Sequence, residues 1–236
     1  MVDERKDVVP EKIDPFAKAV DDARRKKSKI YFGAVRGEGA NRGRHNGVDL
    51  FVPIGTDIQI PAQKVILIGT VREAGSGPGA SMGNGLVFFV PDEKQPYFLQ
   101  LCHLSSRTFG ILRRHGYKAG SEISERPGGE VVAIAGSSRA GAMPHVHASA
   151  MTSIYFGGKV YEAANFLEMY REGRMLRKNF AGVKPPSRFR NPMSLGGYLD
   201  PISLIDQGRL RFSNRPAPQL VAGMTEKEKR VLLALR

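Results

Sequence analysis

The sequence predicts a mainly β protein, formed as an antiparallel sheet folded on itself with few helices. The 236 residues include 27 glycines and 15 prolines, and these residues separate short apolar runs of strand length. Hydrophobic residues make up 41% of the chain, which supports a packed core. At this length one or two domains are expected, and we predict one globular domain with extensions at both ends.

The first expected element is a helix near the N-terminus. Asp14 is a typical N-cap residue, and Pro15 suits the first helical position. The helix ends in the basic run 24–27, which is typical of a solvated helix end beside a linker. Residues 1–29 contain no apolar stretch of the kind found in secretory signals. We expect them to form an N-terminal helical and linker segment.

Histidines are the most informative residues, because there are only five and four of them lie in three short motifs. The motifs are His45-x-x-x-Asp49, Cys102-His103-Leu104 and His145-Val146-His147. Zinc in catalytic sites takes neutral imidazole and carboxylate ligands, usually three, and leaves one position for water. The motifs together therefore predict one zinc site. The fifth histidine, His115, belongs to no motif and is expected in a surface loop.

His45 and Asp49 can share a metal only if the chain bends between them. Residues i and i+4 of a straight strand are roughly 13 Å apart, too far for two ligands of one ion. Asn46 and Gly47 favour a turn here, because both tolerate positive φ. The apolar run 50–53 then predicts a strand that begins at Asp49.

The other histidines are expected on strands. His145 and His147 differ by two positions and so share one face, where one can bind a metal and the other can reach substrate or the metal-bound water. His103 ends a predicted strand over 97–103. Its neighbour Cys102 would point to the opposite face, which argues against a Cys–His nucleophilic pair.

In this order, the motifs between 30 and about 151 resemble the lysostaphin/LytM-type zinc metallopeptidases, which cut peptide bonds in bacterial cell-wall peptidoglycan. The matching segments are 31–36, His45-x-x-x-Asp49, 53–58, 60–62, the glycine-rich loop 75–85, 103–105, 132–138, 144–147 and the downstream 198–204. The resemblance implies an antiparallel barrel-sandwich hybrid fold (a duplicated hybrid motif).

The resemblance also implies roles for five residues. His45, Asp49 and His147 would bind one Zn²⁺ per chain, and His103 and His145 would form the catalytic pair. The expected chemistry is hydrolysis of an amide by a metal-activated water. Which histidine acts as the general base stays open, as does the peptide bond that is cut, whether a glycyl cross-bridge or a D-alanyl–diaminopimelyl link.

Two departures from the family pattern concern the substrate groove. His147 is followed by 148–150, Ala-Ser-Ala, where the family more often has a bulky apolar residue and then Glu. Residues 157–197 form a longer insertion than the family's hairpin, with a helix predicted over 161–170. We therefore predict a peptidase domain at 30–206 with this insertion.

Charge points to an anionic partner. The net charge is +13, and residues 156–236 hold 15 basic against 7 acidic residues. Such a surface attracts anionic polymers, so peptidoglycan and anionic envelope polymers are the expected partners. Nucleic acid is not expected, because no helix-turn-helix, zinc-knuckle or aromatic-studded basic motif is present. The basic tail 207–236, with a short helix predicted at 225–235, could contact a protein partner.

The expected location is the cell envelope or the extracellular space, including a lysin carried by a phage particle. No apolar run approaches the ~18 residues of a membrane span, and the single cysteine cannot form an intramolecular disulfide. We also hypothesise that residues 1–29 cover the cleft as a latency segment.

Two other function classes share the implied fold. A phosphocarrier domain of related fold has no need of an H-x-x-x-D pair. A LytM-like protein that only binds the wall and activates other envelope enzymes is the main alternative. Such degenerate members usually lack ligand positions, whereas all five positions are filled here.

Overall fold

The computed structural model describes residues 14–39, 42–71, 83–124, 129–138, 143–156, 158–174 and 193–212. The helix predicted at 225–235 lies outside these residues, as do most of the glycine-rich loop at 75–85 and much of the 157–197 insertion.

A seven-stranded antiparallel sheet forms the centre of the molecule, with strand order β13-β10-β7-β6-β5-β8 and β3 paired with β10 beside this path. The strands are β3 (Val48–Leu50), β5 (Lys64–Val71), β6 (Asn84–Val90), β7 (Tyr97–Leu104), β8 (Glu122–Ser124), β10 (Val146–Met151) and β13 (Tyr198–Leu199). The predicted mainly antiparallel β fold is confirmed. In the described part of the chain the sheets stay open rather than closing into a barrel.

Three small antiparallel pairs accompany the sheet. They are β1 (Val35–Arg36) with β2 (Gly43–Arg44), β4 (Asp57–Gln59) with β9 (Val131–Ile134), and β11 (Ser153–Phe156) with β12 (Lys159–Glu162). The β1–β2 pair matters most for function, because β2 leads directly into His45 and β3.

Four α-helices lie around the sheets in the described residues: α1 (Pro15–Arg24), α2 (Thr108–Arg114), α3 (Ala163–Arg171) and α4 (Pro201–Asp206). The two helices predicted at the N-terminus and at 161–170 are confirmed as α1 and α3. Asp14 caps α1 as expected, since its carboxylate accepts a hydrogen bond of 2.9 Å from the Phe16 N–H. None of the described helices is long and apolar enough to cross a membrane.

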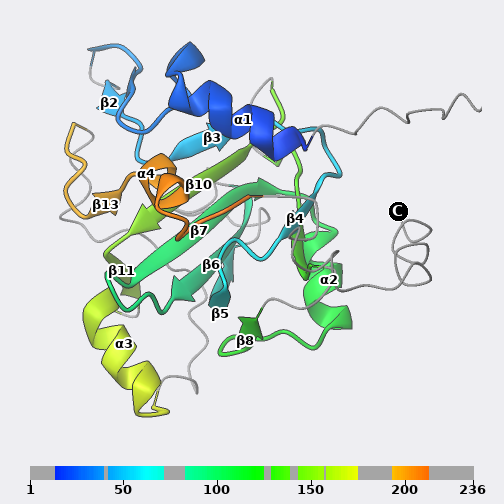
Figure 1. The fold of residues 1–236 in the computed structure, drawn as a ribbon, viewed down its shortest axis with the longest axis vertical. Helices are drawn as coiled ribbons and strands as arrows, with labels where there is room; N and C mark the ends of the chain where they lie inside the picture. The colour runs from blue at the N-terminus through cyan, green and yellow to red at the C-terminus, as the bar shows by residue number, and fades with distance from the viewer. Residues whose placement is uncertain are drawn as a thin grey trace, which may run out of the picture.

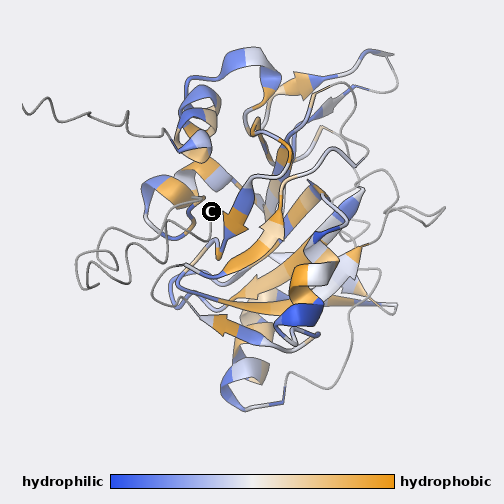
Figure 2. Ribbon diagram, turned by 90° about the vertical axis from the view of Figure 1, so that its right-hand side faces the viewer, coloured by the Kyte–Doolittle hydropathy of each residue, from blue (hydrophilic) through white to orange (hydrophobic). Residues whose placement is uncertain are grey.

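The central sheet is buried on both faces. Along β6, Leu86, Phe88 and Val90 belong to the larger core cluster, whereas Val87 and Phe89 belong to the smaller one beside α3. This alternation follows from the two-residue period of a strand. Figure 2 shows the resulting apolar interior, with the polar residues gathered on the helices and outer loops.

Helix α1 is part of this core. Phe16, Ala19, Val20 and Ala23 recur at helical spacing and are all buried. The helix contacts β3 and α4, and Figure 1 shows it lying across β3. A short 3-10 turn, Lys27–Lys29, follows α1 and leads to the buried Ile30. The domain boundary between 29 and 30 therefore stays a prediction, within a continuously packed stretch of chain.

Candidate metal centre

The centre is built where β3 and β10 pair. Asp49 and His147 are direct partners in the antiparallel register, and β10 also pairs with β7 on its other side. Directly opposed residues of such strands place their Cβ atoms about 4.5–5.5 Å apart on one face of the sheet. The register itself therefore brings the carboxylate of Asp49 to the imidazole of His147.

His45 reaches the same place from the loop between β2 and β3. Its N–H donates to Ala34 O and its carbonyl accepts from the Gly33 N–H, both at 2.8 Å. The bend after it differs from the one predicted. Neither Asn46 nor Gly47 has a positive φ. Gly47 is needed for close approach instead, because a Cβ there would lie 2.3 Å from Ala148 O and 2.8 Å from His147 Nε2.

Three donor atoms converge into one small triangle. His45 Nε2 lies 3.1 Å from His147 Nδ1 and 3.1 Å from Asp49 Oδ1, and His147 Nδ1 lies 2.8 Å from Asp49 Oδ1. Ligands about 2.0–2.1 Å from a tetrahedral zinc ion stand roughly 3.3 Å apart. The triangle is therefore close to one face of a zinc tetrahedron, with the fourth corner left over. All three side chains are within reach of one metal ion.

Neighbouring groups fix which imidazole nitrogen is free. His45 Nδ1 lies 3.1 Å from Tyr31 O, a carbonyl that can only accept, so it must carry the proton. His147 Nε2 lies 2.8 Å from Ser149 Oγ, which can accept its N–H. With the outer nitrogens engaged in this way, the converging nitrogens are the ones that would offer their lone pairs to a bound metal ion. This is the usual way in which neighbours orient metal-binding histidines.

The second oxygen of Asp49 is held by Arg36. Arg36 Nη2 lies 2.6 Å from Asp49 Oδ2, and the guanidinium also donates to Lys29 O from Nε and Nη2. Burial alone would raise the pKa of Asp49, but its contacts with His147 and His45 outweigh this and lower the pKa. Asp49 is therefore an anion that offers Oδ1 to the triangle.

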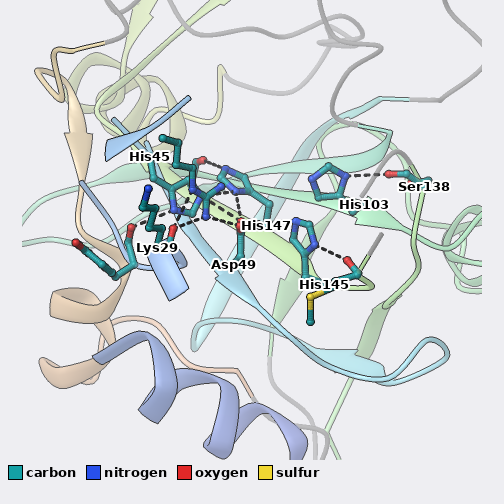
Figure 3. A network of polar contacts seen from close by, with 11 residues as sticks. Lys29, His45, Asp49, His103, Ser138, His145 and His147 are labelled. Carbon is teal, nitrogen blue, oxygen red and sulfur yellow. Dashed lines mark hydrogen bonds and ion pairs between the residues drawn. The ribbon is translucent and has the colours of Figure 1, made fainter. Parts of the chain in front are cut away.

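His103 and His145 lie together on the other side of His147 from His45 (Figure 3). Their ring centroids are 4.6 Å apart. His103 Nδ1 is 2.8 Å from Ser138 O, and His145 Nδ1 is 2.9 Å from Met143 O. Both Nδ1 atoms therefore carry the proton, and each Nε2 keeps a lone pair. Burial lowers the pKa of His103, which keeps its ring neutral at pH 7.

A β-bulge brings His103 to this side of the sheet. Asn84 pairs with Leu104 but Leu86 pairs with Leu101, so β7 holds an extra residue opposite Gly85. His103 itself has φ +61°. In a regular strand its side chain would point away from the face that carries His147, because Cys102 pairs with His147. Bulges often re-aim a side chain next to a functional site in this way.

Two further residues singled out in the sequence, Cys102 and His115, take no part in the triangle of donor atoms. The predicted opposite-face placement of Cys102 and His103 is wrong, because the bulge turns His103 to the side of the sheet that Cys102 faces. Cys102 is nevertheless buried, and burial raises the pKa of its thiol, so it stays protonated and is not a thiolate nucleophile. His115 is exposed, caps the C-terminal end of α2 and lies 3.3 Å from Glu130, apart from the centre.

Arg36 and Ser149 are the partners that sequence reasoning missed. Ser149 had a signal, because it lies two residues after His147 and so shares its face of β10. Arg36 had none, because its approach to Asp49 depends on how the 29–36 segment folds.

Comparisons with known proteins give fold neighbours only. No family model matches the chain, and no curated protein matches it. Among solved structures, it is similar to the catalytic domain of the antimicrobial peptidase lysostaphin from Staphylococcus simulans, at 23% identity and a TM-score of 0.36, covering 58% of this chain and 89% of that one. It is also similar to the catalytic domain of a variant of the prophage-encoded M23 protein EnpA from Enterococcus faecalis, at 21% identity and a TM-score of 0.33, covering 55% and 83%. These neighbours are of the class that the sequence resembles.

Proposed function

We propose that this protein is a zinc-dependent endopeptidase that hydrolyses peptide links of bacterial peptidoglycan. The observation that carries the proposal is the triangle of His45 Nε2, Asp49 Oδ1 and His147 Nδ1, with edges of 2.8–3.1 Å. Two imidazoles and one carboxylate are a ligand set that catalytic zinc sites use, and three protein ligands leave a position for water.

The donor chemistry fits zinc well. Two neutral imidazoles and one carboxylate would leave a bound Zn²⁺ with a net positive charge. When bound, zinc would supply a water of lowered pKa and would polarise the scissile carbonyl. Arg36 keeps Asp49 Oδ2 occupied, which favours binding of the metal through Oδ1 alone.

His103 and His145 would act on protons beside this metal. Each has Nδ1 fixed by a backbone carbonyl and an Nε2 that is free to accept a proton. His145 Nε2 lies 3.7 Å from Asp49 Oδ1, so this ring borders the metal position. One neutral imidazole can take the proton of the attacking water, and the other, once protonated, can deliver it to the leaving amine. General acid–base assistance of this kind contributes roughly 10²–10⁴-fold.

Peptidoglycan is proposed as the substrate because the sequence motifs resemble wall peptidases and the chain is strongly cationic. Anionic polymers of the envelope would concentrate such a protein at the wall. The proposed place of action is accordingly the cell envelope or the extracellular space.

The test combines zinc content with loss of turbidity of purified sacculi. Three proteins are compared: the full chain, His145→Ala and, as a matched control, His115→Ala. One zinc per chain in all three, with lysis lost only in His145→Ala, is the expected result. Zinc without lysis by the unmodified chain would point to a wall-binding protein that does not hydrolyse. Absence of zinc would rule out the metal centre.

A further inference from the structure

A basic cavity of about 900 Å³ adjoins the metal centre. Among the described residues that line it are four cationic side chains and one carboxylate: Lys26, Lys29, Arg42, Arg44 and Glu38. Tyr31 and Phe32 also line it and add aromatic residues to the charged ones. The cavity therefore combines an excess of positive charge with an apolar surface, and it is not used in the chemistry described above.

The cavity and the metal centre share backbone. Tyr31 lines the cavity, and its carbonyl accepts the Nδ1–H of His45 at 3.1 Å. Arg44 also lines the cavity and is the residue before His45. Figure 3 shows Lys29 on the same side of His147 as His45, away from His103.

Arg36 ties the two sites together. Its guanidinium donates to Lys29 O at 2.9 and 2.6 Å and to Asp49 Oδ2 at 2.6 Å. The wall of the cavity is therefore held by the same side chain that holds a proposed metal ligand.

The cationic wall is held in a strained backbone. Lys26, Ser28 and Lys29 have φ of +54°, +49° and +55°, a region that residues other than glycine rarely adopt. The Lys26 ammonium lies 5.9 Å from the centre of the Tyr31 ring. Strain of this kind persists only where surrounding contacts hold it, and it clusters at binding sites. Here the contacts of Arg36 with Lys29 O provide part of that support.

We infer that this cavity binds a free carboxylate carried by the substrate peptide close to the amide that is cut. The inference rests on the proposed function, and it narrows the substrate class. A peptide that runs from the metal past His45 toward Arg44 advances about 3.3 Å per residue, so a residue close to the scissile amide would reach the cavity. Arginine pairs well with carboxylates, and the aromatic wall suits an aliphatic stem.

An uncharged glycyl bridge offers this cavity only backbone carbonyls, with neither a charge nor an aliphatic stem. A cross-link that bears a carboxylate beside the scissile amide offers both the charge and the stem. The structure therefore favours carboxylate-bearing peptides as substrates over glycyl bridges.

The test measures binding to sacculi with zinc-loaded full chain, by co-sedimentation. All proteins carry His145→Ala so that the sacculi stay intact. Lys29→Gln/Arg44→Gln removes two charges from the cavity, and Arg113→Gln/Lys118→Gln removes two from elsewhere as a matched control. Three substrates are used: sacculi stripped of phosphate polymers, the same sacculi with carboxyls converted to amides, and sacculi that retain the phosphate polymers.

We expect the cavity variant to bind stripped sacculi roughly tenfold more weakly than its parent, as the loss of charge-assisted contacts implies. On amidated sacculi the two should bind equally, and the control should match the parent throughout. Equal losses in both double variants would overturn the inference, and so would a loss that persists on amidated sacculi. If the cavity variant bound more weakly than its parent only on sacculi that retain the phosphate polymers, the cavity would be a phosphate site. That result would also overturn the inference.

A second measurement needs no variant in the cavity. Free glutarate should displace the parent protein from stripped sacculi, whereas glutaramide should not. Failure of glutarate to compete would count against the inference. The lysis and zinc assays of the proposed function do not depend on either outcome, so the two proposals can fail separately.

Discussion

Gly47 shows how one missing side chain can set the geometry of the centre. It lies against β10, where a Cβ would come within 2.3 Å of Ala148 O and 2.8 Å of His147 Nε2. Backbone cannot yield at such a distance, so any side chain would push β3 and Asp49 away from His147. The glycine is therefore explained by close approach.

Gly47→Ala should accordingly weaken zinc binding by more than tenfold and destabilise the fold by roughly 1–3 kcal/mol, as overpacking does. Zinc titration against a competing chelator and thermal unfolding would measure the two effects. Gly110→Ala is the matched control, because nothing lies within 4 Å of its added Cβ in α2. There the change should stabilise by up to about 1 kcal/mol. Unchanged zinc affinity in Gly47→Ala would contradict the close-approach explanation.

Ser149 contacts His147, a proposed metal ligand, and would affect a bound metal only through that ring. Its Oγ lies 2.8 Å from Nε2 of that ring and can accept its N–H. Loss of such a partner typically costs 10–100-fold in metal affinity. We expect Ser149→Ala to lower zinc affinity about tenfold, measured by chelator competition. Ser203→Ala, on the exposed side of α4, is the control and should leave zinc affinity unchanged. Equal affinities in both variants would show that Ser149 does not orient His147.

At the scale of elements, the sequence predicted strands better than it predicted their irregularities. Alternation and apolar runs indicated β7 and β10, and the spacing of two placed His145 and His147 on one face. The bulge that re-aims His103 could not be predicted, because it depends on the register between β6 and β7. Local pattern specifies a strand, but a bulge is a property of two strands.

Helix α1 was predicted from its cap, yet its packing was not. The basic run after it was interpreted as leading into a linker. In the structure Phe16 is fully buried and stacks on Phe212 with ring centroids 5.7 Å apart, and the helix contacts β3. Amphipathic spacing shows that a helix has an apolar face, but it does not say which element covers that face.

Phe16→Ala should therefore destabilise the protein by about 3–5 kcal/mol, as expected for a buried aromatic side chain. Because α1 contacts β3, lysis at elevated temperature should fall as well. Thermal unfolding and turbidity assays would measure both, with the exposed Lys18→Ala as the control, expected within about 0.5 kcal/mol. If residues 1–29 were instead a latency segment with no structural role, Phe16→Ala would raise activity and leave stability unchanged.

For the molecule as a whole, the sequence predicted the kind of fold and singled out five residues that the structure brings together, whereas the supporting contacts had to come from tertiary structure. The histidines could be found because they are few and regularly spaced. Arg36 could not, since it is one of 36 basic residues and only the fold brings it to Asp49.

The net charge of +13 leads to a prediction at the same scale. Attraction between exposed charges and an anionic wall acts over the Debye length, which falls from about 10 Å at 0.1 M salt to about 3 Å at 1 M. Binding of the full chain to sacculi should therefore weaken strongly over this range, as co-sedimentation would measure. Zinc affinity should change little, because Asp49 and His45 are buried and buried charges are screened far less. Sacculus binding that is insensitive to salt would mean that contacts other than long-range charge hold the protein at the wall.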